Sequence, residues 1–344
     1  MKKLIKLEKI KVDISKYTEE FLNPDYIFLK GNPEYKINDY VYMGRISSIS
    51  GRVININNNI ITIENDFREL TKNSNNKISI KNKNDLISIL PIIKNIGKID
   101  GIVVNAINDE PYVYNRIFLL KNNIHKILDT VNMLSNILKV TNNMIAIKNN
   151  ESFIIDECLN VIGTYPNIKI ALLSDEYLIG HKKYLLRKLN MVDNILYLSI
   201  EDILSLNNMI NGYLETTKYI TITYNNKSSI YRIKIGTPLK SIISKYYNIK
   251  GSFTIIINGL MKGYEAKDIS NIFISDDIES IFINTTIKKK ETKCYNCGLC
   301  EQVCPENVCI FTQKNIDKCI HCNLCSYICP AHINLNKYLG DYDE

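Results

Sequence analysis

The sequence has no tryptophan, only four histidines among 344 residues, and no two glycines in the spacing G-x-G. It carries neither a Rossmann dinucleotide fingerprint nor a Walker A phosphate loop. No run approaches the roughly 18 consecutive apolar residues that a membrane-spanning helix needs, and we find no signal peptide pattern. We therefore expect a cytoplasmic protein, either free or peripheral on the cytoplasmic face of a membrane.

The formal net charge is +7, but lysine, asparagine and isoleucine are abundant along the whole chain. The charge therefore reflects overall composition and not a selected basic patch. The densest basic run, Lys288–Lys290, is typical of a solvated linker; the alternative is a docking patch for an acidic carrier or an anionic membrane surface. Since no nucleic-acid-binding signature is present, we expect no nucleic-acid partner.

Cysteine is almost absent before residue 294 and then abundant. Eight of the ten cysteines form two copies of the spacing C-x2-C-x2-C-x3-C-P. This is the bacterial ferredoxin pattern for a pair of [4Fe–4S] clusters, in which the fourth cysteine of each run ligates the other cluster. The predicted ligands are Cys294, Cys297, Cys300 and Cys329 for cluster 1, and Cys319, Cys322, Cys325 and Cys304 for cluster 2.

Other uses of cysteine fit this spacing less well. Structural zinc takes four ligands, usually from paired C-x2-C knuckles, and disulfide frameworks belong to oxidising compartments. Cys158 and Cys309 lie outside the repeat, and we interpret them as ordinary buried thiols. His321 and His332 flank the predicted clusters, but we expect no side chain to act as an acid, base or nucleophile.

The remaining chain divides by its periodicity. Residues 24–66 are typical of short strands, with a hairpin turn at Asn57–Asn59. Residues 86–212 alternate strands with amphipathic helices, which predicts an α/β domain with a largely parallel sheet. The strands are expected at 102–105, 144–147, 168–173 and 195–198, and the helices at 117–138, 152–161, 178–189 and 199–212. Residues 218–285 show a hairpin, a helix at 238–247 and a strand at 253–257, which is β-grasp-like.

This order of parts resembles the C subunit of the Rnf electron-transport complex. One stretch that carries the resemblance is Ile63–Asp66, which resembles the end of the family's barrel domain. Five further stretches are each similar to a motif of that family. They are Tyr35–Val41 with Ile49–Val53 ("VKVGDxV…SGxV"), Ile99–Pro111 with Arg116 ("IDxLIINGAECEPY…R"), Ile235–Leu239 ("RIGTP"), Asn258–Gly263 ("GGPMMG") and Cys319–Leu335 (the second cluster run).

The resemblance implies a multidomain fold of α/β and β parts. The expected order is an N-terminal lead-in (1–23), a barrel-sandwich-hybrid or lipoyl-like domain (24–66), a Rossmann-like α/β domain similar to the flavoprotein subunit of respiratory complex I (86–212), a soluble-ligand-binding β-grasp (SLBB) domain (218–285) and a C-terminal ferredoxin-like module with two [4Fe–4S] clusters (291–338).

The chain departs from the family where a flavin would bind. In the family a glycine-rich loop, "GLGGAGFPT", precedes the "IDxLIIN" strand, and its glycines let backbone N–H groups approach phosphates closely. Here Leu90–Lys98 leads into that strand with a single glycine. We therefore expect that FMN and NADH are not bound in the family's manner. If a nucleotide does bind, Asp109 and Glu110 are the residues expected to line its site. No lysine of residues 24–66 has a biotinyl or lipoyl context, so we expect no covalent biotin or lipoate.

The favoured hypothesis is an electron-transfer subunit of an RnfC-like complex. Its clusters would relay single electrons between a protein donor and a protein acceptor, which are other subunits of a membrane-associated complex of translocase type. It would have no independent catalytic site. The alternatives are an NADH- or FMN-dependent oxidoreductase subunit, an adaptor that feeds a soluble reductase of the proline-reductase type, and a redox sensor or assembly scaffold.

Overall fold

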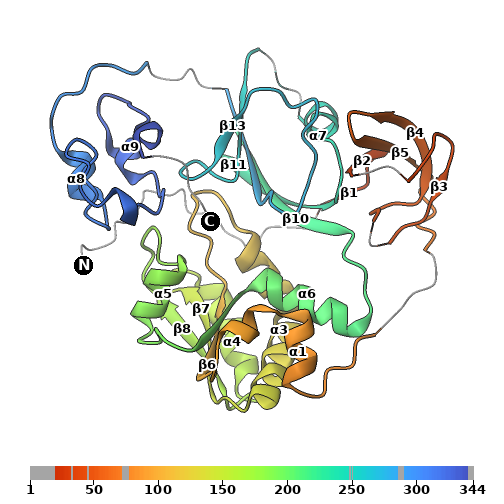
Figure 1. Cartoon of the computed structure of the whole chain (residues 1–344), viewed down its shortest axis with the longest axis horizontal. Helices are drawn as coiled ribbons and strands as arrows, with labels where there is room; N and C mark the ends of the chain where they lie inside the picture. The colour runs from red at the N-terminus through yellow and green to blue at the C-terminus, as the bar shows by residue number, and fades with distance from the viewer. Residues whose placement is uncertain are drawn as a thin grey trace.

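The computed structural model describes residues 20–31, 34–44, 46–71, 77–247, 249, 251–285 and 290–339. The fold is mixed α/β and contains several sheets. Figure 1 shows a parallel α/β unit, a mixed sheet above it, a small antiparallel sheet to one side and the cysteine-rich C-terminal module to the other. Residues 1–19 of the expected lead-in, and Lys288 and Lys289 of the basic run, lie outside the described residues. Across the ranges given, no helix is both long and apolar enough to cross a membrane.

The N-terminal sheet is antiparallel, with strand order β2-β5-β4-β3. Its apolar side chains alternate along the strands, and Ile27, Val53 and Ile63 are fully buried between them. The predicted hairpin turn is confirmed, because Asn58 and Asn59 both take left-handed backbone conformations, as a type I′ turn requires. The strands are β2 (Tyr26–Lys30), β3 (Tyr40–Val41), β4 (Gly51–Asn57) and β5 (Ile60–Asn65).

Gly51 explains one of the motif residues of this sheet. A Cβ atom added at Gly51 would lie 1.7 Å from the carbonyl oxygen of Glu64 on β5. No side chain fits there unless the two paired strands move apart. The glycine of the "SGxV" motif is therefore required by the close approach of β4 to β5.

The central sheet is parallel throughout, with strand order β8-β7-β6-β9. The predicted alternation of strands and helices is confirmed. The strands are β6 (Gly101–Asn105), β7 (Asn142–Lys148), β8 (Ile168–Leu173) and β9 (Ile195–Ser199). The helices are α1 (Lys83–Ile89), α2 (Ile92–Asn95), α3 (Asn115–Leu138), α4 (Ser152–Ile162), α5 (Lys182–Lys188) and α6 (Ile200–Asn211). Strands β7 and β8 lie on one side of β6, whereas β9 lies on its other side, so the strand order reverses between β6 and β9. Open parallel sheets bind ligands at the carboxyl ends of the strands at such a switch point.

The predicted helix over 178–189 is wrong over its first turn, because α5 begins at Lys182. Leu178 has a left-handed φ of 70° that ends any helical path there. The apolar residues before α5 belong instead to a loop that packs into the core, where Tyr177, Leu178 and Ile179 are buried. Burial of this loop, and not helical periodicity, accounts for its apolar sequence.

Helix α6 begins and ends where its sequence predicts. Ser199 Oγ accepts a hydrogen bond from the Asp202 N–H (3.1 Å), and Asp202 Oδ2 accepts one from the Ser199 N–H (2.7 Å), which is a capping box. The helix ends at Gly212, whose φ of 74° is left-handed.

Replacing Ser199 by alanine is expected to lower the free energy of unfolding by about 1 kcal/mol, since one N–H of the first turn loses its acceptor. Chemical denaturation measures the change. Ser205→Ala, at a half-buried position of the same helix where the hydroxyl donates only to the exposed Glu215 (2.9 Å), is the matched control and is expected to change stability by less than about 0.5 kcal/mol. Equal effects of the two substitutions would contradict the capping role.

The mixed sheet has the strand order β1-β11-β10-β14-β12-β13. Its edge strand β1 comes from the end of the expected lead-in and pairs in parallel with β11. The predicted hairpin, helix and following strand are present. The elements are β1 (Glu20–Leu22), β10 (Thr217–Tyr224), β11 (Lys227–Lys234), α7 (Leu239–Tyr246), β12 (Thr254–Ile257), β13 (Tyr264–Ala266) and β14 (Ser280–Asn284).

The cysteine module (residues 290–339) contains little regular structure. It has two short helices, α8 (Leu299–Val303) and α9 (Leu324–Ile328), and two 3-10 turns, Ile316–Lys318 and Leu335–Tyr338. Its own fully apolar core is small and consists of Val308, Ile310, Leu335 and Leu339. A unit of this size with so few buried aliphatic side chains needs a further source of stability, such as bound metal.

Candidate metal centres and nucleotide site

The two cysteine runs fold in the same way. Each cysteine of the first run recurs 25 positions later in the second. The residues before α8 and α9, Gly298 and Asn323, both have left-handed backbones, with φ of 71° and 61°. The same conformation recurs at two further pairs of equivalent positions, Asn296 with His321 and Asn307 with His332. These repeated left-handed positions bend each run around a point, so that the module is an internal repeat in structure as well as in sequence.

Two cavities in the module are lined by cysteine. The first is lined by Cys294, Cys297, Cys300 and Cys329. The second is lined by Cys304, Cys319, Cys322 and Cys325, with Cys300 also at its wall. Each cavity therefore includes the first three cysteines of one run and the fourth cysteine of the other, and Cys300 borders both.

The surroundings of the sulfurs suit thiolate ligands. Backbone N–H groups point at three of them: Asn296 N lies 3.4 Å from Cys294 Sγ, and His321 N lies 3.4 Å from Cys319 Sγ. Val308 N lies 3.3 Å from the Sγ of Cys304, the fourth cysteine of the first run. Hydrogen bonds to sulfur stabilise the charge of a cluster and are one determinant of its potential.

The donor set fits a cluster better than a single ion. In the described part of the chain, no three His, Cys, Asp or Glu side chains converge as ligands of one metal ion do. A four-iron cluster holds its thiolates farther apart, because each sulfur binds a different corner of the cube. Burial raises the pKa of Cys322 to about 12 and that of Cys325 to about 11, so bound metal would have to displace their protons. The residues present therefore fit an iron–sulfur cluster in each cavity.

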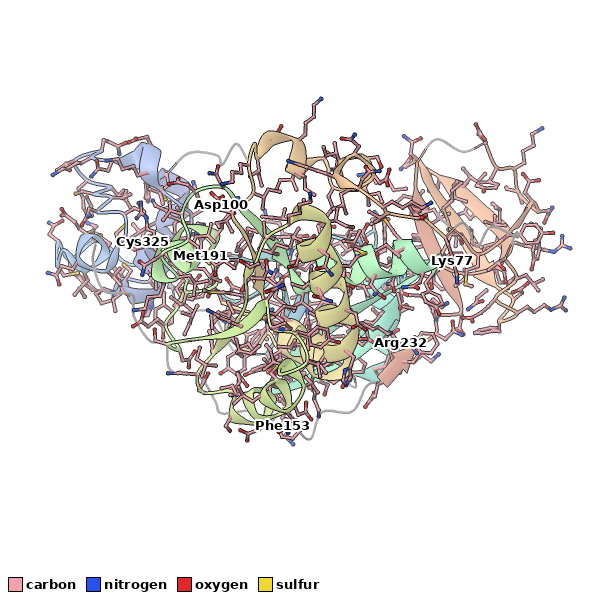
Figure 2. All side chains as sticks on the ribbon, turned by 90° about the horizontal axis from the view of Figure 1, so that it is seen from below. Lys77, Asp100, Phe153, Met191, Arg232 and Cys325 are labelled. Carbon is pink, nitrogen blue, oxygen red and sulfur yellow. The ribbon has the colours of Figure 1, made fainter. Side chains whose placement is uncertain are left out.

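The two cavities differ in exposure. Cys294 and Cys297 are exposed, whereas Cys322 is buried. Cys322 and Leu324 pack into one apolar cluster with the loop before α5, with Met191 and with Met261 of the mixed sheet. Figure 2 shows the module, labelled at Cys325, against the part of the α/β unit labelled at Met191. The second cavity therefore faces the rest of the protein and the first faces solvent.

A buried hydrogen bond fixes this arrangement. The Tyr177 hydroxyl donates to the carbonyl oxygen of Cys322 at 2.9 Å. Tyr177 is 1 % exposed, and burial raises the pKa of its hydroxyl far above the ordinary value. No sequence motif pointed to Tyr177, because its partner lies 145 positions further along the chain.

The switch point of the parallel sheet is closed by the protein's own side chains. The Asn105 Nδ2 donates to the Gly180 carbonyl (2.9 Å) and to the Tyr197 hydroxyl (2.8 Å). The Gly180 N–H donates to Asp109 Oδ1 at 2.9 Å. A Cβ at Gly180 would lie 2.9 Å from the side chain of Ile107, so the loop needs glycine to come this close. The loop before α5 thus covers the carboxyl ends of β6 and β9.

Glu110 does not share the environment of Asp109, although the two are adjacent. Its Oε2 accepts a hydrogen bond from the Met261 N–H (2.9 Å) and its Oε1 accepts one from the Lys262 N–H (3.0 Å). The carboxylate lies over Gly259, where an added Cβ would be 2.3 Å from Oε2. Asp109 therefore fastens a loop of the α/β unit, and Glu110 joins that unit to the mixed sheet.

The pKa of Glu110 is raised by burial, although the two backbone N–H groups oppose the rise. A carboxyl group with a raised pKa in the folded state favours folding below its unfolded pKa, near about 4.3, and that contribution is lost as the pH rises through the folded value. The stability of the natural protein relative to a Glu110→Gln variant is therefore expected to fall as the pH rises through this window and to level off above it. Denaturation of both proteins at a series of pH values measures the difference. A constant difference would contradict the assignment.

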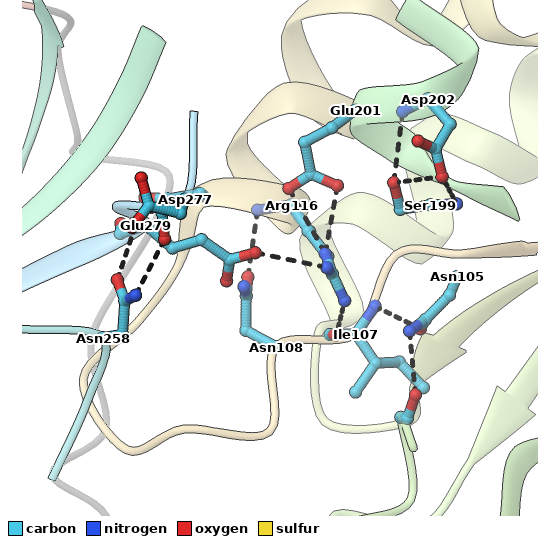
Figure 3. Close-up of polar contacts among 12 residues, drawn as sticks. Asn105, Ile107, Asn108, Arg116, Ser199, Glu201, Asp202, Asn258, Asp277 and Glu279 are labelled. Atoms are coloured by element: carbon cyan, nitrogen blue, oxygen red, sulfur yellow. Dashed lines mark hydrogen bonds and ion pairs between the residues drawn. The ribbon is translucent and has the colours of Figure 1, made fainter. Parts of the chain in front are cut away.

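Arg116 organises a third set of contacts (Figure 3). Its Nε lies 3.2 and 3.1 Å from the two oxygens of Glu201, and its Nη2 lies 3.6 Å from Glu279 Oε1. Its Nη1 donates to the Ile107 carbonyl at 3.2 Å. The motif arginine therefore pairs with carboxylates of α6 and of the mixed sheet, and its charge is matched within the protein.

The carboxyl ends of the four parallel strands fit a phosphate poorly. A phosphate in such a sheet sits on the N-terminus of the following helix. Here a carboxylate follows each strand, before or within the first turn of the next helix: Asp109 and Glu110 after β6, Glu151 after β7, Asp175 after β8, and Glu201 and Asp202 after β9. Two of these are ion-paired, Asp175 with Lys148 and Glu201 with Arg116, each at 3.1 Å. A groove between α3, α6 and the mixed sheet also carries charges of both signs, including Arg116 and Glu201. The expected lining pair Asp109 and Glu110 does not converge on one ligand position.

Comparison with known proteins relates the chain to redox proteins. Residues 93–195 match the family model described as "Nuo51 FMN-binding domain". The C subunit of the ion-translocating oxidoreductase complex from Buchnera aphidicola subsp. Acyrthosiphon pisum is 26% identical over 236 residues, which cover 63% of this chain and 50% of the relative. The protein of the same name from Haemophilus influenzae (strain ATCC 51907 / DSM 11121 / KW20 / Rd) is 23% identical over 232 residues, or 61% of this chain and 28% of the relative. The chain resembles the C subunits of ion-translocating oxidoreductase complexes.

The predicted resemblance to RnfC-like proteins is thereby confirmed. The aligned region spans half or less of the length of these relatives. The match to the FMN-binding domain begins at residue 93, inside the stretch that stands in place of the family's glycine-rich loop. Among solved structures, the NAD+-reducing [NiFe]-hydrogenase is similar with a TM-score of 0.47 in the H2-reduced state, at 9% identity over 56% of this chain and 41% of that one. The structure of the air-oxidised state has a TM-score of 0.44, at 8% identity over 54% of this chain and 40% of that one.

Proposed function

We propose that this protein is an electron-transfer subunit of an RnfC-like complex and carries two [4Fe–4S] clusters. The observation that supports this most directly is the pair of cavities, each of which brings the first three cysteines of one run together with the fourth cysteine of the other. When bound, such clusters take up and release single electrons. The chain's own residues hold the sulfurs, donate N–H groups to them and exclude water with apolar side chains.

We further propose the assignment of the parts. The N-terminal sheet is the barrel-sandwich-hybrid domain, the parallel sheet is a flavoprotein-like α/β domain, the mixed sheet is an SLBB β-grasp domain and the cysteine module is a double-cluster ferredoxin domain. The exposed cysteines Cys294 and Cys297 make cluster 1 the cluster that an external protein partner can approach closely. The partners are a protein donor and a protein acceptor within a membrane-associated complex, which the protein joins from the cytoplasmic side.

A second candidate is an FMN- or NADH-dependent subunit, because residues 93–195 match an FMN-binding domain. The closed switch point argues for the first candidate, since the loop at Gly180 is held there by Asn105 and Asp109. We propose that flavin and NADH are not held at this position and that the α/β domain supports the clusters.

Cofactor analysis of anaerobically purified protein tests both candidates. The expected result is about eight irons and eight acid-labile sulfides per chain with no stoichiometric flavin, since each [4Fe–4S] cluster holds four of each. Zinc in place of iron would overturn the electron-transfer proposal. Bleaching of the cluster absorbance by NADH, in the absence of any partner, would favour the flavin-dependent subunit instead. Purification of the complex from membranes or from the soluble fraction then separates the RnfC-like role from an adaptor to a soluble reductase.

A further inference from the structure

Glu306 lies at the junction of the cysteine module and the α/β unit. It follows the predicted ligand Cys304 by two residues and lines the second cavity. Its Oε2 lies 2.5 Å from Lys183 Nζ, and its Oε1 accepts a hydrogen bond from the Tyr184 hydroxyl. Lys183 and Tyr184 belong to α5, so two residues of the α/β unit hold one carboxylate of the module.

The carboxylate is sheltered from water and charged. The Glu306 side chain is 11 % exposed, and Tyr184 is 1 % exposed. The Lys183 ammonium lies 2.5 Å from Glu306 Oε2, so the two side chains form an ion pair. Charges in a sheltered site act over a lower effective dielectric than exposed ones.

The internal repeat has no counterpart of this charge. The position of Glu306 in the first run corresponds to Ala331 in the second, because both follow a Cys-Pro pair directly. Ala331 is 1 % exposed and lines the first cavity. The two cavities thus differ in a sheltered carboxylate with its lysine partner, in addition to their difference in exposure.

We propose that Glu306, held by Lys183 and Tyr184, lowers the reduction potential of cluster 2 and has no counterpart at cluster 1. Reduction adds one electron and one negative charge to a cluster, so a nearby carboxylate disfavours the reduced state and a nearby ammonium favours it. Through Lys183 the α/β unit partly offsets the carboxylate and thereby sets the potential of the cluster next to it. Glu306 and Lys183 are positioning and tuning residues. The inference rests on the proposed pair of clusters.

Redox titration with dithionite, followed by electron paramagnetic resonance, tests the proposal on Glu306→Gln and Lys183→Gln. Glu306→Gln is expected to shift one of the two potentials to a more positive value and leave the other unchanged. Lys183→Gln is expected to shift the same potential to a more negative value. A purely structural role predicts shifts of the same sign in both variants, since both loosen the same contact. Shifts of the same sign, shifts of both clusters or no shift would overturn the proposal.

Glu291→Gln provides the matched control. Glu291 is an exposed carboxylate of the same module, paired with Lys337 at 2.8 Å, and removing its charge is expected to leave both potentials unchanged because solvent and salt screen it. An equal shift in this variant would show that any carboxylate of the module acts alike, which contradicts the proposal. If Glu306→Gln loses a cluster, the direction of the potential shift in Lys183→Gln still tests the proposal, because Lys183 lies outside the ligand runs. Natural protein without two clusters would refute the proposed function, whereas two clusters with unmoved potentials would refute this inference alone.

Discussion

Cys304→Ser is expected to remove the cluster that is otherwise held by the second cysteine run, and to lower the iron content from about eight to about four per chain. The reason is that Cys304 lines the cavity of Cys319, Cys322 and Cys325, although it belongs to the first run. A serine hydroxyl is a much poorer ligand for iron than a thiolate. Iron and sulfide analysis of the purified variant measures the loss.

Double substitutions identify which cysteines share a cluster. Cys304→Ser combined with Cys319→Ser is expected to lose no more iron than either alone, because both changes affect one cluster. Cys304→Ser combined with Cys294→Ser is expected to lose both clusters. Residues that act as one unit show this non-additivity, and residues in separate units do not. If each run held its own cluster, the two outcomes would be exchanged. Cys158→Ser and Cys309→Ser are controls and are expected to retain full iron content, since neither cysteine lines a cysteine cavity.

Periodicity predicts the parallel sheet nearly strand by strand because its strands and helices carry strong and separate apolar patterns. The spacing along α3 places Ile117, Leu120, Ile127 and Val131 on one buried face. The short strands β1, β13 and β14 have no comparable pattern. Strands β1 and β14 form because they pair with partners distant in the chain, β11 and β10, whereas β13 pairs with the nearby β12.

The prediction of the ligand sets of the candidate metal centres has a local basis. Each set depends on spacing within a short run and on one crossed cysteine, so no distant contact has to be known. Tyr177, Lys183 and Glu306 could not be predicted in this way, since each of their contacts joins positions more than 120 residues apart. Asp109 and Glu110 show the opposite problem. Their motif suggested one nucleotide site, and the folded chain gives them separate backbone partners.

Replacing Glu110 by alanine is expected to lower the free energy of unfolding by about 2 kcal/mol, because two partly sheltered N–H groups lose their acceptor. These are the backbone groups of Met261 and Lys262. The carboxylate also fills the space above Gly259, which alanine would leave empty. Chemical denaturation measures the loss.

Glu110→Gln separates a structural role from a nucleotide-binding one. Glutamine keeps the volume and one of the two acceptor oxygens. A structural role therefore predicts that Glu110→Gln has a free energy of unfolding between those of the natural protein and of Glu110→Ala. Iron content and both cluster signals are expected to stay unchanged in either variant, because Glu110 lines neither cysteine cavity. A nucleotide-binding role predicts instead that both substitutions leave stability intact and abolish binding of FMN or NADH. Glu110 accepts hydrogen bonds from two consecutive backbone N–H groups of the loop between β12 and β13, so the motif glutamate connects the α/β unit to that loop.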